Sequence, residues 1–294
     1  MFKKGFLLSI LATILAVAYL WFNAGQLNLS STASQAESDK LKISFLDVGQ
    51  GDAILIQSPQ GQKILIDGGE SSDKLLEDLG QELGWFDRGL NYVFLTHPHA
   101  DHVKGLNGLF DRFKIEQAVG TLVNHNSSAY KFWLDSLVTK KIKVINSFAN
   151  RKFNFDNGLE LTILSPDEDL KGRDVDNLNN SSLVMLLTYG QTKFLLMGDA
   201  EEPIEKDLLS RGVDLQAQVI KIGHHGSTTS TSQEFLEAVG PQMAVISVGA
   251  NNDFGHPHVR ILNRLERAGI KILRTDQLGT IRFLSDGTTL ELLD

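Results

Sequence analysis

Residues 96–102 read Thr96-His97-Pro98-His99-Ala100-Asp101-His102 and directly follow an apolar run, Tyr92-Val93-Phe94-Leu95. Such a run predicts a buried strand, so the polar segment begins where that strand ends. Alternate residues of an extended chain share one face, so His97 and His99 point the same way, and Asp101 and His102 follow after a turn. Zinc, manganese and iron all accept imidazole and carboxylate ligands. With only 8 histidines in 294 residues, the cluster favours a metal site over a solvated loop.

Further potential ligands follow other predicted strands. A rigid sheet can build a metal site by carrying the ligands on loops that gather at one of its edges. These additional residues are Asp199 after Lys193–Met197, His224 and His225 after Ala217–Ile222, and His256 and His258 after Met243–Val248.

Composition describes an ordinary globular chain. With 294 residues, 42% of them hydrophobic, it can fill one large core or two smaller ones, and 22% charged residues with 26 glycines suit an α/β protein. The net charge of -8 argues against a broad surface that coats nucleic acid, although a local site remains compatible with it. The chain has no cysteine, which excludes disulfides and thiolate ligands.

The N-terminal forty residues differ from the rest. Lys3 and Lys4 precede an uncharged run from Gly5 to Phe22, so residues 1–22 are predicted to be a signal anchor that crosses the cell membrane once, with the rest of the chain outside the cytoplasm. A cleaved signal peptide, which would release a secreted protein, is the alternative. Residues 23–40 are predicted to be a flexible linker, and residues 41–294 one globular domain.

Apolar periodicity predicts alternating strands and helices in that domain. The helix predicted over 103–113 would begin beside the histidine segment, where its dipole would favour an anion. Helices are predicted over 73–83, 103–113, 129–138, 201–211, 235–239 and 259–268, and strands over 41–46, 53–57, 63–66, 92–95, 117–123, 159–164, 183–188, 193–197, 217–222, 243–248, 270–273, 281–284 and 290–293.

The motifs resemble those of the metallo-β-lactamase superfamily, which implies an αββα four-layer sandwich with a two-metal site. The similarity is closest to the hydrolase domain of ComEC-type competence proteins and extends from about Phe45 to Ile281. The multi-helix channel region of those proteins has no counterpart in this sequence, so no channel function is implied. The matching segments are FLDVGQGDA (45–53), THPHADHVKGL (96–106), NNSSLVMLLTYGQTKFLLMGDAE (179–201), VIKIGHHGS (219–227), FGHPH (254–258) and RLERAGIKILRTDQLGTI (264–281).

The resemblance assigns ligands for two divalent ions, zinc or manganese. His97 and His99 would hold the first ion, and Asp101 and His102 the second. Asp199 would bridge both, and Asp101 could also orient the attacking water. Both carboxylates are therefore predicted to be catalytic as well as metal-binding.

Either His224 or His225 would complete the second site. We favour His225 as the ligand and His224 as a catalytic residue that contacts substrate and assists the leaving group. Many superfamily members carry another histidine where this chain has Asn180. Asn180 is expected to donate to substrate or to bind the metal weakly, and the smaller number of imidazoles favours manganese somewhat.

The remaining polar residues each have two interpretations. His256 and His258 could bind substrate or cap the following helix, and Ser227 could bind phosphate or stabilise a turn. Lys221 lies close enough in sequence to contact a phosphate as well. Asp67 could orient a metal ligand from behind or satisfy its own turn, whereas Asp52 fits a turn better.

The combined prediction is a metal-dependent hydrolase that cleaves phosphodiesters, with single-stranded DNA outside the membrane as the substrate. One alternative is an esterase for small phosphoesters, such as phosphorylcholine groups of the cell envelope. Another is a non-catalytic binding module that retains a metal. β-Lactam hydrolysis is not supported by this subgroup's motifs. No sequence feature indicates an oligomeric state.

Overall fold

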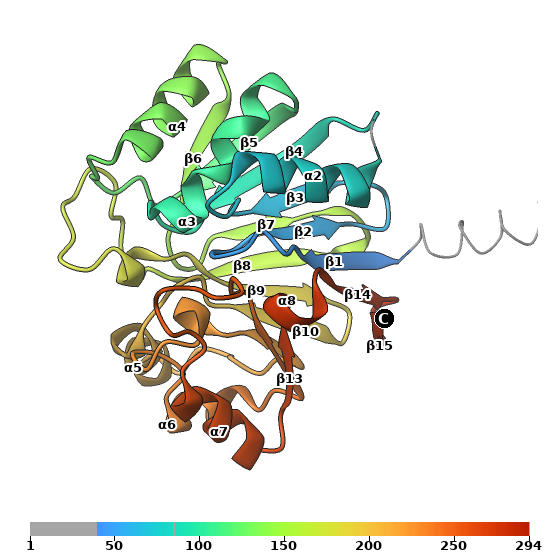
Figure 1. Ribbon diagram of the computed structural model, residues 1–294, viewed down its shortest axis with the longest axis vertical. Coiled ribbons are helices and arrows are strands. Elements are labelled where there is room, and N and C mark those ends of the chain that lie inside the picture. Colours follow the sequence, from blue (N-terminus) through green and yellow to red (C-terminus); the bar gives the residue numbers. More distant parts are fainter. Residues whose placement is uncertain (1–39, 85, 294) are drawn as a thin grey trace, which may run out of the picture.

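Two β-sheets lie face to face in the computed structural model, which describes residues 40–84 and 86–293, and helices cover the outer face of each sheet (Figure 1). One sheet has the strand order β15-β14-β1-β2-β3-β4-β5-β6, and the other has the order β13-β12-β11-β10-β9-β8-β7. This arrangement confirms the predicted αββα four-layer sandwich.

The strands of the first sheet are β1 (Leu41–Phe45), β2 (Ile54–Gln57), β3 (Lys63–Ile66), β4 (Gly89–Leu95), β5 (Lys114–Gly120), β6 (Lys143–Asn146), β14 (Ile281–Ser285) and β15 (Leu290–Leu293). Those of the second are β7 (Lys152–Asn154), β8 (Glu160–Ser165), β9 (Val184–Tyr189), β10 (Thr192–Leu196), β11 (Val219–Lys221), β12 (Met243–Ile246) and β13 (Lys271–Arg274). The helices are α2 (Ser72–Leu83), α3 (Ala100–Val103), α4 (Ser128–Thr139), α5 (Glu202–Ser210), α6 (Gln233–Val239), α7 (Val259–Arg267) and α8 (Thr275–Leu278). Short 3₁₀ helices are η1 (Gly105–Asp111), η2 (Asp156–Gly158), η3 (Asn179–Ser181) and η4 (Gly223–Gly226).

Three apolar clusters explain the four layers. The central cluster fills the space between the sheets, where the ring of Phe283 meets those of Phe45 and Phe194 at centroid distances of 6.0 and 5.4 Å. A second cluster joins the first sheet to α2, η1 and α4, and a third joins the other sheet to α5, α6 and α7. Each sheet is therefore buried on both faces, which agrees with the nearly continuous apolar runs of its strands.

Parallel strands in both sheets direct the chain towards one edge. Strands β3 to β6 run parallel in the first sheet, and β10 to β13 run parallel in the second. The loops that follow β4, β10, β11 and β12 carry the histidines and the aspartate singled out in the sequence. The sandwich thereby brings residues from distant segments to one place.

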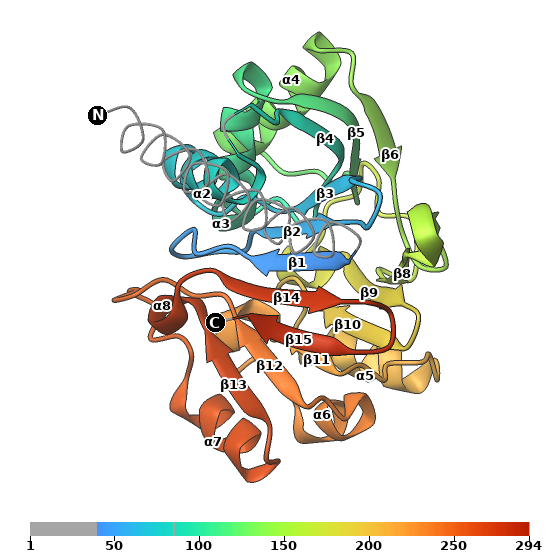
Figure 2. The same cartoon turned by 90° about the vertical axis from the view of Figure 1, so that its right-hand side faces the viewer.

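The last two strands belong to the first sheet. β14 pairs antiparallel with β1, with Leu41 opposite Ser285, and β15 lies beyond β14 (Figure 2). One sheet is therefore built from both ends of the domain.

The helix predicted over 103–113 is wrong. Helix α3 ends at Val103, and the chain continues as the 3₁₀ helix η1. The change occurs at Gly105, where a Cβ atom would lie 1.7 Å from the carbonyl oxygen of Gly68. This backbone crossing leaves no room for a side chain at position 105, and the expected long α-helix beside the histidine segment is replaced by one turn of α-helix and a 3₁₀ helix.

Strands β6 and β7 were not predicted. β6 forms the edge of its sheet, and its residues are exposed or half-buried, so it lacks the apolar pattern of the inner strands. β7 is three residues long and buries only Phe153. Short edge strands of this kind leave little hydrophobic signal in a sequence.

The predicted signal anchor, residues 1–22, lies outside the described residues, as does the predicted linker, residues 23–40, apart from Lys40. Within the described part of the chain, no helix has the length and apolar character needed to cross a bilayer.

Candidate metal centre

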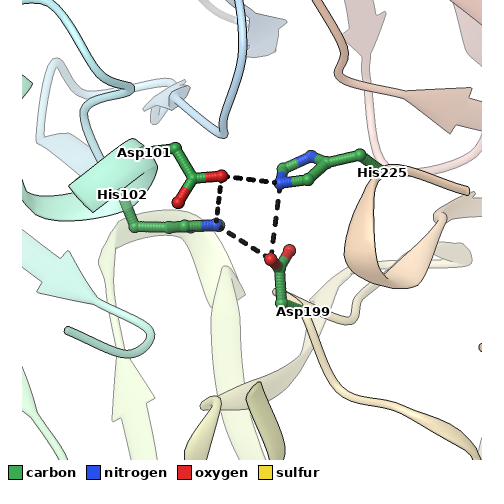
Figure 3. A group of neighbouring side chains, drawn as sticks. All are labelled: Asp101, His102, Asp199 and His225. Atoms are coloured by element: carbon green, nitrogen blue, oxygen red, sulfur yellow. Dashed lines mark ion pairs between the residues drawn. The ribbon is translucent and has the colours of Figure 1, made fainter. Parts of the chain in front are cut away.

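Four acidic and imidazole side chains converge where the two halves of the sandwich meet (Figure 3). Asp101 and His102 belong to α3, Asp199 follows β10, and His225 lies in η4 after β11. Each offers one ligand atom, and these atoms lie within 4.8 Å of one another. Oδ2 of Asp199 lies 3.2 Å from Nε2 of His102 and 3.3 Å from Nε2 of His225. Oδ2 of Asp101 lies 3.3 Å from the same His225 nitrogen.

His97 and His99 form a second group beside the first. Nε2 of His97 lies 3.0 Å from Nδ1 of His99 and 3.9 Å from Oδ2 of Asp199. The rings of His97 and His102 are 4.2 Å apart between centroids. Asp199 is therefore the residue that the two groups share.

Buried nitrogens without a partner indicate that these residues fit divalent cations. Nε2 of His102 and Nε2 of His225 are buried, and neither makes a hydrogen bond of acceptable geometry with any residue in 40–84 or 86–293. A buried polar atom without a partner costs folding free energy, and such atoms are rare. Two of them directed at the same carboxylates suit a cation that accepts imidazole and carboxylate ligands.

Contacts behind the site fix the orientation of His102. Its Nδ1 lies 2.8 Å from Oδ2 of Asp67, which also accepts a hydrogen bond of 2.7 Å from Oγ1 of Thr96. The other oxygen of Asp67 accepts from the Thr96 backbone N–H at 2.8 Å. A proton held on Nδ1 leaves Nε2 free to face the centre. Burial raises the pKa of Asp67, against the lowering effect of His102.

His225 is held in the same manner. Its Nδ1 donates to the carbonyl oxygen of Ser247 at 2.9 Å, which directs Nε2 into the centre. His225 has a positive φ of 52°, a conformation that is uncommon for residues other than glycine.

Electrostatics within the centre favour positive charge. Although burial alone would lower it, Asp199 and Asp101 raise the pKa of His225 to about 9. Burial would also lower the pKa of His102, but Asp199 and Asp67 together hold this pKa well above its usual value. In return, His225 and His102 hold the pKa of Asp199 well below its usual value, against the effect of burial. The carboxylates thus stabilise positive charge at the centre, as they would the charge of a bound cation.

Lys221 lies behind the centre and does not face solvent. Its side chain is fully buried, and Nζ donates to the carbonyl oxygen of Gly198 at 2.9 Å and forms an ion pair with Asp52. Nζ also lies 3.7 Å from Oδ1 of Asp199. The expectation that Lys221 contacts a phosphate is therefore wrong, because its ammonium group is enclosed. Asp52 is buried as well, so it does more than stabilise a turn.

His224 lies at the rim. It has a positive φ of 46°, and its side chain is 24% exposed. Nδ1 lies 3.0 Å from Oε1 of Glu201, and Nδ2 of Asn179 is 3.4 Å from the ring. Sequence reasoning did not single out Glu201 or Asn179, although both belong to the same motif as Asp199.

The residues predicted to bind substrate have different environments. Oδ1 of Asn180 accepts from the Glu201 backbone N–H at 3.1 Å, and Oγ of Ser227 accepts from Oγ1 of Thr229 at 3.0 Å. Nδ1 of His258 accepts from the N–H of Arg260 at 3.2 Å and caps α7. These three side chains therefore have structural partners.

His256 lies nearest to the centre among the predicted substrate-binding residues. Its ring is 5.4 Å from that of His224 and 6.5 Å from that of His225, between centroids. Burial, assisted by the neighbouring His224 and His225, lowers the pKa of His256 to about 4. The ring is therefore neutral at physiological pH.

Comparison with known proteins identifies the family. The sequence model of the metallo-beta-lactamase superfamily matches residues 46–250. This match spans more than half of the chain, which therefore belongs to that superfamily and is a metal-dependent hydrolase. The fold implies divalent metal ions, and the histidine and aspartate group described above suits them.

Curated relatives include competence proteins. The chain is 29% identical to ComE operon protein 3 of Bacillus subtilis (strain 168) over 262 residues, 84% of this chain and 33% of that protein. It is 30% identical to competence protein ComA of Neisseria gonorrhoeae over 242 residues, 82% of this chain and 32% of that protein. The chain thus spans about a third of the length of these relatives.

A solved structure with the same fold is the metallo-beta-lactamase fold protein YhfI of Bacillus subtilis. It superposes with a TM-score of 0.52 at 12% identity and covers 79% of this chain and 95% of that chain. At this identity the likeness supports the fold alone.

Gly51 provides a test of how closely the centre depends on backbone packing. A Cβ atom at Gly51 would lie 1.8 Å from the carbonyl oxygen of Asp101. Gly51→Ala is expected to displace the start of α3 and to lower kcat/KM about a hundredfold, because a misplacement of roughly 1 Å at an active site has that effect. Steady-state hydrolysis and thermal unfolding would measure the change.

Gly61→Ala is the matched control. Gly61 also has a positive φ, 87°, but no described heavy atom lies within 4 Å of its Cβ position. This variant should lose about 1–2 kcal/mol from backbone strain and keep its kcat/KM. Equal effects on activity from the two substitutions would show that contact with Asp101 does not position the centre.

Proposed function

We propose that this chain is a two-metal phosphodiesterase that hydrolyses single-stranded DNA at the outer side of the cell membrane, to which residues 1–22 attach it. The observation that carries the proposal is the convergence of Asp101, His102, Asp199 and His225, whose buried imidazole nitrogens lack hydrogen-bond partners among the described residues. Such a centre suits the charge of a phosphodiester better than that of a neutral ester.

The proposed ligands divide into two sets. His97 and His99 hold one ion, and His102, Asp101 and His225 hold the other, with Asp199 shared between them. Zinc and manganese both fit imidazole and carboxylate ligands, and the absence of a further histidine at Asn180 favours manganese. Asp67 keeps His102 in the tautomer that presents Nε2.

When bound, two cations at such a centre lower the pKa of a water molecule and neutralise charge on the phosphoryl oxygens. Asp101 keeps 25% of its side chain accessible to solvent and would orient the attacking water. His224 stands at the rim, where Glu201 contacts its Nδ1, and its ring would assist the leaving group.

Two considerations support DNA as the substrate. The motifs resemble those of the ComEC-type hydrolase domain, and one curated relative is named as a competence protein. The net charge of -8 does not provide a general attraction for nucleic acid, so recognition must come from the centre and its immediate rim.

Metal removal and replacement test the proposal. Protein stripped with a chelator should cleave neither labelled single-stranded DNA nor a small chromogenic phosphodiester, and reloading with manganese or zinc should restore both activities. Activity is expected to fall to the uncatalysed background, because none of the described residues can take over the role of the cations. Full metal occupancy without hydrolysis of any phosphodiester would refute the function. Hydrolysis of the small diester without cleavage of DNA would favour the small-phosphoester esterase.

A further inference from the structure

An exposed aromatic ring stands beside the candidate metal centre. Phe254 lies in the loop between β12 and α7, and its side chain is 68% exposed. Its ring stacks on that of His256, with centroids 5.9 Å apart and an angle of 24° between the planes. Because His256 in turn contacts the rings of His224 and His225, two ring-to-ring steps connect Phe254 to the centre.

Hydrogen bonds fix the loop that carries Phe254. The side-chain amide of Asn252 donates to the carbonyl oxygens of Gly249 and His256 at 3.0 and 2.6 Å. Its Oδ1 accepts from the backbone N–H groups of Phe254 and His256 at 3.2 and 3.0 Å. One asparagine thus closes the loop around itself, and Phe254 is held at its tip.

Both ends of the loop are also attached to the domain. The N–H of Gly249 donates to Oε1 of Gln50 at 3.2 Å, and the N–H of His258 donates to the carbonyl oxygen of Gly226 at 2.9 Å. Pro257 is buried against Gly226, where an added Cβ would lie 2.7 Å from the proline ring. Phe254 is therefore held outward by a supported loop, so its exposure does not result from an unsupported chain.

We propose that Phe254 is a stacking platform for one nucleobase of the nucleotide next to the scissile phosphate. Phe254 remains 68% exposed although its ring stacks on His256, and every base can stack on an aromatic face. The subsite would recognise a base by stacking and without positive charge. An acidic protein needs such a contact to hold a nucleic acid. It rests on the phosphodiesterase function proposed above and names the part of the substrate that the rim recognises.

Three small substrates isolate this contact. Methyl 4-nitrophenyl phosphate and the 4-nitrophenyl esters of thymidine 5′- and 3′-phosphate share the leaving group and differ in the presence of a nucleoside. The native metal-loaded protein should prefer at least one thymidine ester. Phe254→Ala should lower kcat/KM for that ester about ten- to a hundredfold, the effect of one base stacked on one ring, and leave the methyl ester unchanged. The loss should fall on KM, because the base is remote from the reacting atoms.

Two further variants separate stacking from structure. Phe254→Trp should retain the preference for the thymidine ester, because a larger aromatic face replaces the phenyl ring. Phe86→Ala is the matched control, because Phe86 is fully exposed and precedes β4 at the end opposite the centre. This control substitution should leave kcat/KM unchanged for all the esters.

The outcomes distinguish the subsite from the overall function. Hydrolysis of the methyl ester without any preference for a thymidine ester would overturn the subsite and leave the phosphodiesterase intact. An unchanged preference in Phe254→Ala would overturn it as well. Failure of the metal-loaded protein to hydrolyse any of the esters would refute the phosphodiesterase function and the subsite with it.

Discussion

Asp199→Asn is expected to abolish hydrolysis, with kcat/KM lowered by at least about 1,000-fold. Asp199 contacts both groups of imidazoles, with Oδ2 at 3.2 Å from His102 and 3.9 Å from His97. An amide keeps the shape of the side chain but removes the negative charge that two cations require. Electrostatic stabilisation at a metal centre contributes several kcal/mol to the transition state, which corresponds to the expected loss.

Elemental analysis of Asp199→Asn provides a second measurement, because the metal content should fall below two ions per chain. Asp214→Asn is the control. Asp214 is 60% exposed and pairs with Lys193 on the surface at 2.7 Å, so its loss should affect neither metal content nor activity. Native metal content together with native activity in Asp199→Asn would contradict the bridging role.

Lys221→Met is expected to destabilise the fold by about 3–5 kcal/mol, the usual cost of removing one partner of a buried ion pair. Both Lys221 and Asp52 are buried, so the substitution would leave the Asp52 carboxylate enclosed without its cation. Chemical denaturation of the metal-free protein would measure the free energy of unfolding.

A double substitution distinguishes the ion pair from general packing. Asp52→Asn combined with Lys221→Met removes both charges and should recover much of the lost stability. Lys193→Met is the surface control and should cost less than about 1 kcal/mol, because exposed ion pairs contribute little. A cost below 1 kcal/mol for Lys221→Met would show that the buried pair does not hold the end of β11 against the loop between β1 and β2.

The sequence predicted most inner strands because their two buried faces produce continuous apolar runs. The strand predicted over 63–66 has the same bounds as β3, and the helix predicted over 73–83 differs from α2 by one residue. Edge strand β6 and the 3₁₀ helix η1 were missed because exposure and a glycine-dependent backbone crossing leave no periodic pattern.

The candidate centre could be predicted in part because its side chains follow strands, where a sheet brings distant loops together. Spacing could not show that Lys221 turns inward to Asp52, since the two residues are far apart in the chain and Asp52 lies in a loop of the other sheet. The contact of Glu201 with His224 also depends on the fold. The loop geometry that exposes Phe254 arises from one asparagine side chain, which no apolar pattern records.

The pairing of β14 with β1 has a consequence for how the enzyme is made. One edge of β1, residues 41–45, is covered only when β14, residues 281–285, pairs with it. Nearly the whole domain therefore has to leave the ribosome before this pairing can form. Contacts this distant in sequence close slowly. A ribosome-bound nascent chain that already contains residues 97–102 and 199 would still have an open sheet edge. The edge of β1 is thus covered only after residues 281–285 have been synthesised.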